Sequence, residues 1–130
     1  MNGYTFERRE LKYRITDAQR AALEAAFGAR MVPDEHGEST ICNIYYDTAD
    51  YRLIRASLEK PAYKEKLRLR SYYENPANDD RVFIELKKKA DGCVNKRRVT
   101  MKYADALRFL DTGVCEKTGD YMHDMVAHEI

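Results

Sequence analysis

The sequence predicts an α+β fold, in which an antiparallel β-sheet carries helices on its outer face. Three segments between residues 62 and 103 are rich in β-forming residues and are separated by short turn sequences, which is typical of an antiparallel meander. Long charged side chains occupy every second position of these segments, as expected for strands with one polar and one apolar face. Helical patterns precede and follow this region.

The first half of the chain contains two predicted strands and two predicted helices. In chain order they are a strand over residues 4–15, a helix over 18–28, a strand over 39–47 and a helix over 48–59. Thr16 and Asp17 resemble an N-cap, and Gly28 is a typical helix stop. The second strand is rich in β-branched and aromatic residues, and the second helix has Tyr51 and Ile54 on one face.

The second half contains the meander and two short helices. The predicted elements are strands over residues 62–73, 81–89 and 94–103, and helices over 104–110 and from 120 to the end. Residues 75–80 form a cluster of turn-forming residues. Asp91 and Gly92 form a dipeptide that favours a tight hairpin turn. The three strands are therefore predicted to pair in sequence order.

The composition describes a single globular domain over residues 1–130 with a sizeable core. No apolar run approaches the roughly 18 residues that a membrane helix needs, so the sequence predicts no membrane segment. The cysteines, Cys42, Cys93 and Cys115, follow no metal-binding spacing. They predict reduced thiols in a cytoplasmic protein.

The charge of the chain is unevenly distributed, although its formal net charge is only +1. Residues 60–102 contain 13 Lys or Arg and 6 Asp or Glu, a local excess of +7. Lys66, Arg68 and Arg70 share one face of their predicted strand, and Leu67 and Leu69 share the other. A solvated sheet face is the alternative interpretation. A mostly cationic face repels itself, however, so this pattern favours binding of a polyanion such as a phosphate chain.

Two carboxylates, Glu10 and Glu85, stand among these cations on their predicted strands. Each could be a salt-bridge partner of the cations, or a ligand of a divalent metal ion that bridges phosphates. The histidines, His36, His123 and His128, follow no pattern that predicts a metal or catalytic site.

The chain has no Walker-type glycine-rich loop, no G-x-G-x-x-G, no G-x-S-x-G and no Cys–His zinc pattern. Tyrosines beside basic residues, such as Tyr45 and Tyr72, could stack on nucleobases, or could fill and border a β-sheet core.

Five motifs occur in a family-specific order between residues 8 and 98. They are Arg8-x-Glu10-x-Lys12-Tyr13, Asn43-Ile44-Tyr45-Tyr46-Asp47-Thr48, Arg68-Leu69-Arg70-Ser71-Tyr72, Phe83-Ile84-Glu85-Leu86-Lys87 and Lys96-Arg97-Arg98. This order resembles the VTC domain, the polyphosphate-polymerase domain of the triphosphate tunnel metalloenzyme (CYTH-like) superfamily. In that superfamily, antiparallel strands form a tunnel lined by Lys and Arg. Arg8 stands where the opening E-x-E-x-K motif has its first Glu, which is more similar to the VTC branch than to the CYTH branch.

The resemblance implies a role for each matching residue. Phosphate contacts are expected from Lys12, Arg68, Arg70, Lys87, Lys96 and Arg98, joined by Lys66 from the same face. The catalytic residues would be Arg68, Arg70 and Lys87. The metal, Mg²⁺ or Mn²⁺, would be held by Glu10 and Glu85.

The expected activity of the intact domain is metal-dependent phosphoryl transfer from a nucleoside triphosphate to polyphosphate. Expected partners are a nucleoside triphosphate, polyphosphate or pyrophosphate. The alternatives are a non-enzymatic module that binds polyphosphate or inositol phosphates, and binding of single-stranded nucleic acid. The chain resembles the N-terminal portion of a tunnel, so we expect an incomplete barrel, or a homodimer that completes the sheet.

Overall fold

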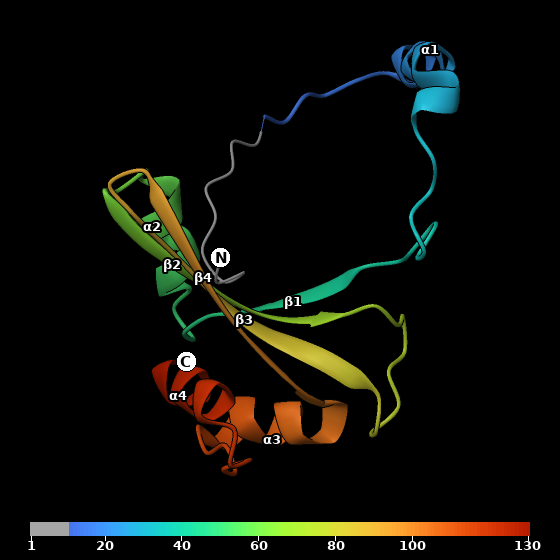
Figure 1. The fold of residues 1–130 in the computed structure, drawn as a ribbon. Helices are drawn as coiled ribbons and strands as arrows, with labels where there is room; N and C mark the ends of the chain where they lie inside the picture. Colours follow the sequence, from blue (N-terminus) through green and yellow to red (C-terminus); the bar gives the residue numbers. More distant parts are fainter. Residues whose placement is uncertain (1–10) are drawn as a thin grey trace. The chain divides into compact units, whose positions relative to one another are not determined.

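The computed structural model describes residues 11–130. The chain divides into two compact units, Met1–Gly37 and Glu38–Ile130. The helices of the described residues are α1 (Asp17–Phe27), the 3₁₀-helix η1 (Gly28–Arg30), α2 (Arg52–Leu58), α3 (Tyr103–Thr112) and α4 (Tyr121–Glu129). The strands are β1 (Cys42–Tyr46), β2 (Tyr63–Ser71), β3 (Arg81–Ala90) and β4 (Cys93–Lys102) (Figure 1).

Helix α1 of the first unit begins and ends where the sequence predicts. The side chain of Thr16 accepts a hydrogen bond from the Gln19 backbone, and the Gln19 side chain accepts one from the Thr16 backbone. This reciprocal capping box satisfies two amide groups that a helix start leaves unpaired. Gly28 has a φ of 41°, which ends the helix because most other residues avoid this conformation.

The strand predicted over residues 4–15 is wrong for its described part. Residues 11–15 have no regular secondary structure, and the rest of the segment lies outside the described residues. Leu11 and Tyr13 are each 77% exposed. Alternation alone does not make a strand, because a strand also needs a partner for its backbone and a core for its apolar face.

The second unit contains a four-stranded antiparallel sheet with the order β1-β2-β3-β4. The predicted meander is confirmed. Asp91 and Gly92 both have positive φ, 45° and 85°, as required by the tight hairpin turn between β3 and β4. Among the described residues the sheet is open, with β1 and β4 at its edges, so the expected tunnel barrel is not formed by this part of the chain.

Helix α2 is shorter than the predicted segment 48–59. The carboxylate of Asp47 accepts hydrogen bonds from the backbone amides of Thr48, Leu53 and Ile54. Tyr51, with a φ of 57°, precedes the first helical residue. The residues after Asp47 therefore form a capped turn that delays the helix to Arg52.

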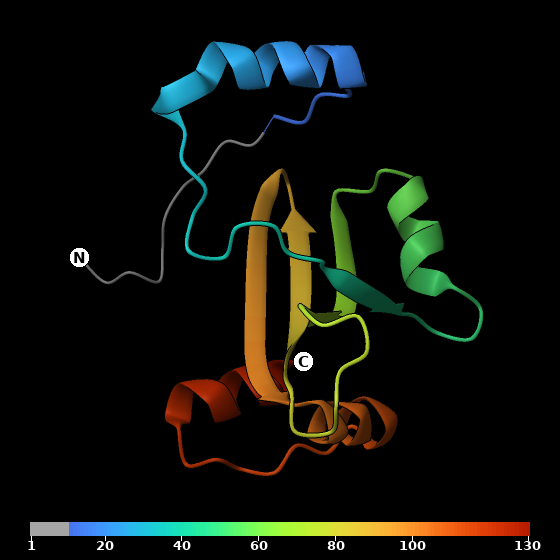
Figure 2. The same ribbon diagram turned by 90° about the vertical axis from the view of Figure 1, so that its right-hand side faces the viewer.

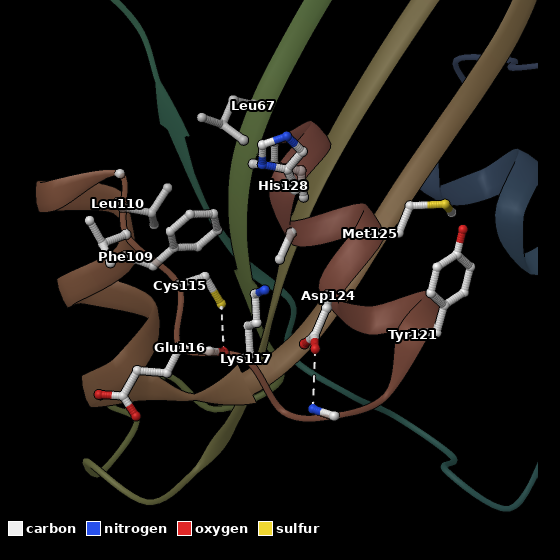
Figure 3. A pocket seen from close by; sticks show the side chains of 15 residues that line it. Leu67, Phe109, Leu110, Cys115, Glu116, Lys117, Tyr121, Asp124, Met125 and His128 are labelled. Carbon is white, nitrogen blue, oxygen red and sulfur yellow. Dashed lines mark hydrogen bonds between the residues drawn. The ribbon is translucent and has the colours of Figure 1, made fainter.

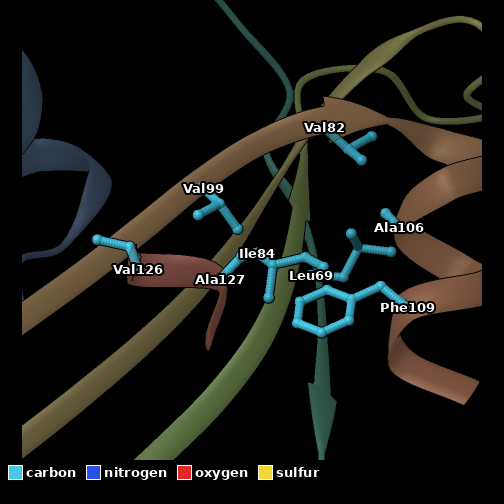
Figure 4. Packing of buried hydrophobic residues seen from close by; sticks show 8 residues of the cluster. All are labelled: Leu69, Val82, Ile84, Val99, Ala106, Phe109, Val126 and Ala127. Carbon is cyan, nitrogen blue, oxygen red and sulfur yellow. The ribbon is translucent and has the colours of Figure 1, made fainter. Parts of the chain in front are cut away.

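One face of the sheet is covered by α3 and α4, which lie together, apart from α2 (Figures 1 and 2). The core has four buried residues from the strands and four from these helices, shown in Figure 4: Leu69, Val82, Ile84, Val99, Ala106, Phe109, Val126 and Ala127. Burial of these side chains supplies the main favourable term for this packing. Among residues 11–130, no helix combines the length and the apolar composition that crossing a membrane requires.

Candidate functional site

The strand register brings the predicted basic residues to one face of the sheet. Leu69, Ile84 and Val99 are directly opposite one another and point into the core beneath α3 and α4. Alternate side chains must then point to the other side of the sheet. Six of the predicted phosphate contacts have this position: Lys66, Arg68, Arg70, Lys87, Lys96 and Arg98. We call this side of the sheet the cationic face.

Two rows of side chains cross the middle of the cationic face. Lys66, Lys87 and Lys96 are directly opposite one another on β2, β3 and β4, and form the lysine row. Two residues further along β2, Arg68 is opposite Glu85, which is opposite Arg98 of β4, and these three form the arginine row. Cross-strand neighbours of this kind are close enough for their side chains to interact.

The carboxylate of Glu85 lies at the centre of the arginine row and is only 1% exposed. Its Oε2 accepts a hydrogen bond from Arg68 Nε at 2.5 Å, and its Oε1 accepts one from Arg98 Nε at 2.7 Å. Lys96 Nζ lies 3.2 Å from Oε1, and Arg70 Nε lies 3.8 Å from Oε2. Burial acts to raise the pKa of Glu85, but the hydrogen bonds from Arg98 and Arg68 outweigh it and lower the pKa to about 2. The carboxylate is therefore ionised at neutral pH.

The lysine row is less neutralised than the arginine row. Lys96 reaches Glu85, but neither Lys66 nor Lys87 has a hydrogen bond or ion pair within the part of the chain that the structure describes. Like charges directly opposite one another on adjacent strands are destabilising. Lys64 and Lys89 form a further pair on the same face. The cationic face thus has more positive charge than its own carboxylate can balance.

Polar and aromatic side chains hold the arginines in place. Arg68 Nη1 donates to Tyr45 Oη at 3.2 Å, and the Arg68 guanidinium lies 6.0 Å from the centroid of the Tyr45 ring. Arg70 Nε donates to Asn43 Oδ1 at 3.0 Å. The Arg98 guanidinium lies 4.6 Å from the centroid of the Phe83 ring, within the range of a cation–π contact.

Sequence reasoning missed the supporting roles of Asn43, Phe83 and Tyr45, and omitted Lys64. A usable signal was present, because Asn43 and Tyr45 alternate on one short strand and Lys64 is in phase with Lys66. This signal would not have shown that Tyr45 contacts Arg68. The two residues are 23 positions apart in the sequence, so their contact depends on the register of β1 with β2.

Two predicted site residues precede the second unit in the chain. Lys12 lies in the first unit, outside the sheet. Glu10 lies outside the described residues. Their predicted roles as a phosphate contact and a metal ligand stay predictions.

A family model described as the VTC domain matches residues 7–130 of the chain. The chain belongs to the VTC domain family. This membership indicates a polyphosphate-related function for the domain. Searches of curated proteins and of solved structures each found no match.

The residues of this VTC domain that the structure describes do not by themselves form a binding site for a divalent metal ion. Residues 11–130 contain no group of three His, Cys, Asp or Glu side chains that could hold one. Both oxygens of Glu85 already face cations, which would repel Mg²⁺ or Mn²⁺. Of the two interpretations that the sequence left open for Glu85, the contacts of this carboxylate favour the salt-bridge partner.

Two cavities lie on the helix-covered side of the VTC domain. One of about 950 Å³ is lined mainly by apolar side chains of α3, α4 and the loop between them, including Phe109, Leu110 and Cys115 (Figure 3). A smaller one of about 330 Å³ lies beside it. Burial raises the pKa of the Cys115 thiol in this lining. All three cysteines are free thiols, as predicted. The mainly apolar lining of the 950 Å³ cavity does not suit a phosphate chain.

Proposed function

We propose that the cationic face of this VTC domain binds a phosphate chain, and that the intact domain transfers a phosphoryl group from a nucleoside triphosphate to polyphosphate. The observation that carries the proposal is the lysine row beside the arginine row. Together they contain cations from three adjacent strands and one buried carboxylate. A polyanion would relieve the repulsion among these cations, and an apolar or cationic ligand would not.

The residues on this face suit phosphoryl transfer in a specific way. The transferred group moves with little covalent help from the protein, so the protein must position the phosphates and neutralise their charge. Arg68 and Arg70 would provide planar forks for pairs of phosphate oxygens, and Lys66 and Lys87 would act as point charges. No side-chain nucleophile is needed for this chemistry.

The first test compares tripolyphosphate binding by the wild-type protein and by Arg68→Ala/Arg70→Ala, measured by isothermal titration calorimetry. We expect the affinity to fall at least about 30-fold, because a hydrogen bond from a charged donor contributes roughly 1.5–3 kcal/mol. Arg97→Ala is the control, since Arg97 lies on β4 but binds Glu129 of α4 on the other face. Equal affinity of the double variant and the wild type would rule out this binding site.

The alternative is a binding module without turnover, which holds polyphosphate or inositol phosphates on the same face. It is favoured by one observation, that residues 11–130 contain no cluster of metal-binding carboxylates. Metal-dependent release or transfer of phosphate from a nucleoside triphosphate would exclude it. Binding without turnover by the 130-residue chain would support it.

Binding of single-stranded nucleic acid is the third candidate. Tyr45 is 58% exposed, but its hydroxyl and ring already contact Arg68, which leaves it less free to stack on a base. Competition between tripolyphosphate and an oligonucleotide of equal charge decides between the ligands. Preferential displacement of tripolyphosphate by the oligonucleotide would favour nucleic acid.

We further propose that the open sheet edges pair with another strand, supplied by a second copy of the chain. Edge strands present unpaired backbone groups that readily bind another strand. β1 is a candidate because it pairs only with β2 among the described strands. Light scattering at several protein concentrations would report a dimer, and a monomer at all concentrations would contradict this pairing.

A further inference from the structure

We propose that Glu85 is a positioning residue, whose buried carboxylate holds Arg68 and Arg98 so that their remaining amino groups face the phosphate chain. This inference rests on the proposed function and assigns a role to a residue that the sequence offered as a metal ligand.

The two oxygens of Glu85 are divided between the neighbouring strands. Oε2 binds Arg68 of β2, and Oε1 binds Arg98 of β4. The carboxylate is 1% exposed, and the arginine side chains are 21% and 34% exposed. Glu85 therefore forms the floor of the arginine row, and the two guanidinium groups form the surface that a ligand can reach.

This arrangement leaves donors available to a ligand. Each guanidinium has five N–H donors in a fixed plane, and Glu85 takes the Nε donor of both arginines. Within residues 11–130, Arg68 Nη2 and Arg98 Nη1 have no hydrogen-bond partner. Phosphate oxygens can bind these groups while Glu85 stays in place, because a guanidinium can bind two anions on different edges.

A guanidinium group that is already fixed also binds a phosphate at a lower free-energy cost than a mobile one. Ordering a long side chain on binding costs free energy, and a side chain that is already held avoids this cost. Arg68 also contacts Tyr45, and Arg98 also contacts Phe83, so each of the two guanidinium groups has a second contact besides Glu85. The carboxylate and the two rings thus set both the position and the plane of each arginine.

For the variant Glu85→Gln, a positioning role and a purely electrostatic role predict opposite changes in the affinity for an anion. Glu85→Gln removes a negative charge from a cationic face, so charge alone predicts tighter binding of an anion. Loss of positioning predicts weaker binding, because the amide has one acceptor oxygen and no charge with which to hold two arginines. If Glu85 were instead a metal ligand, Glu85→Gln would leave the binding of tripolyphosphate in the absence of metal unaffected.

The experiment measures tripolyphosphate binding to the full chain by calorimetry in the presence of EDTA. We expect Glu85→Gln to weaken binding about tenfold, whereas Glu65→Gln, which removes a carboxylate from the other face of β2, stays within twofold. In an Arg68→Ala/Arg98→Ala background, Glu85→Gln should change the affinity less than twofold, because it acts through those arginines. An equal or tighter affinity of Glu85→Gln, or full additivity with the arginine changes, would overturn the inference.

A second measurement uses the wild-type protein and does not depend on the folding of a variant. The Nε–H signals of Arg68 and Arg98 are followed by NMR during addition of Mn²⁺ without phosphate. We expect them to stay sharp, and selective broadening would place the ion at Glu85 and refute the positioning role. Failure of the wild type to bind tripolyphosphate would instead remove the proposed function and this inference together.

Discussion

The two faces of the sheet both contain basic residues, but they differ in how completely carboxylates neutralise them. On the helix-covered face, Lys88 and Arg97 both bind Glu129 of α4, at 3.1 and 2.8 Å. On the cationic face, Lys66 and Lys87 have no such partner within residues 11–130.

The difference separates structural charge from charge that is available for a ligand. Lys88 and Arg97 tie α4 to the strands, next to core residues such as Val126. Lys66 and Lys87 of the lysine row have no ion pair within residues 11–130, and their repulsion across the strands is unfavourable for folding. An anionic ligand bound on the cationic face would offset this repulsion. Variants on each face test this difference.

The largest expected effect is on the helix-covered face. Ile84 is fully buried in the core, so Ile84→Ala should lower the free energy of unfolding by about 2–5 kcal/mol. Urea denaturation measures this, and Lys89→Ala, an exposed position of the same strand, should change it by less than about 0.5 kcal/mol.

The milder Ile84→Val keeps the fold and permits a binding measurement. Its tripolyphosphate affinity should stay within twofold of the wild type, because Ile84 does not point to the cationic face. A large loss of affinity in this folded variant would show that the two faces are not independent.

The second prediction concerns acid stability. Because the pKa of Glu85 is lowered from 4.5 to about 2 in the folded protein, its ionisation stabilises the fold fully above about pH 4.5. This contribution, on the order of 3 kcal/mol, should be lost as the pH falls from 4.5 through 2. Urea denaturation of the wild type and Glu85→Gln at several pH values isolates it, since Asp124, whose pKa is also about 2, titrates in both proteins. Parallel pH profiles of the two proteins would contradict the prediction.

The third prediction separates binding from stability. Lys66→Ala/Lys87→Ala should weaken tripolyphosphate binding about 30-fold, or about 2 kcal/mol, and leave stability unchanged or improved. The matched control is Lys88→Ala/Arg97→Ala, which removes the same number of charges from the other face. It should lower stability, because Glu129 loses its partners, and keep the affinity within about threefold. The comparison between the faces fails if both variants lose affinity equally.

Much of the second unit could be predicted from local sequence. The alternation around Lys66 and Lys87, the turn at Asp91-Gly92 and the dense spacing of strands led to the correct meander. The part that failed, residues 11–15, has the same alternation but exposed apolar residues and no strand. The site was only partly predictable, because the contacts of Glu85 depend on three strands meeting in one register.

The amino-acid sequence by itself determined which side chains share a face, because alternation in a strand is a local property of the backbone. It also determined where α1 is capped, through Thr16, Gln19 and Gly28. Only the tertiary structure decided which face the helices cover, and that Glu85 lies buried between Arg68 and Arg98. These outcomes depend on contacts between residues far apart in the chain, which local periodicity does not specify.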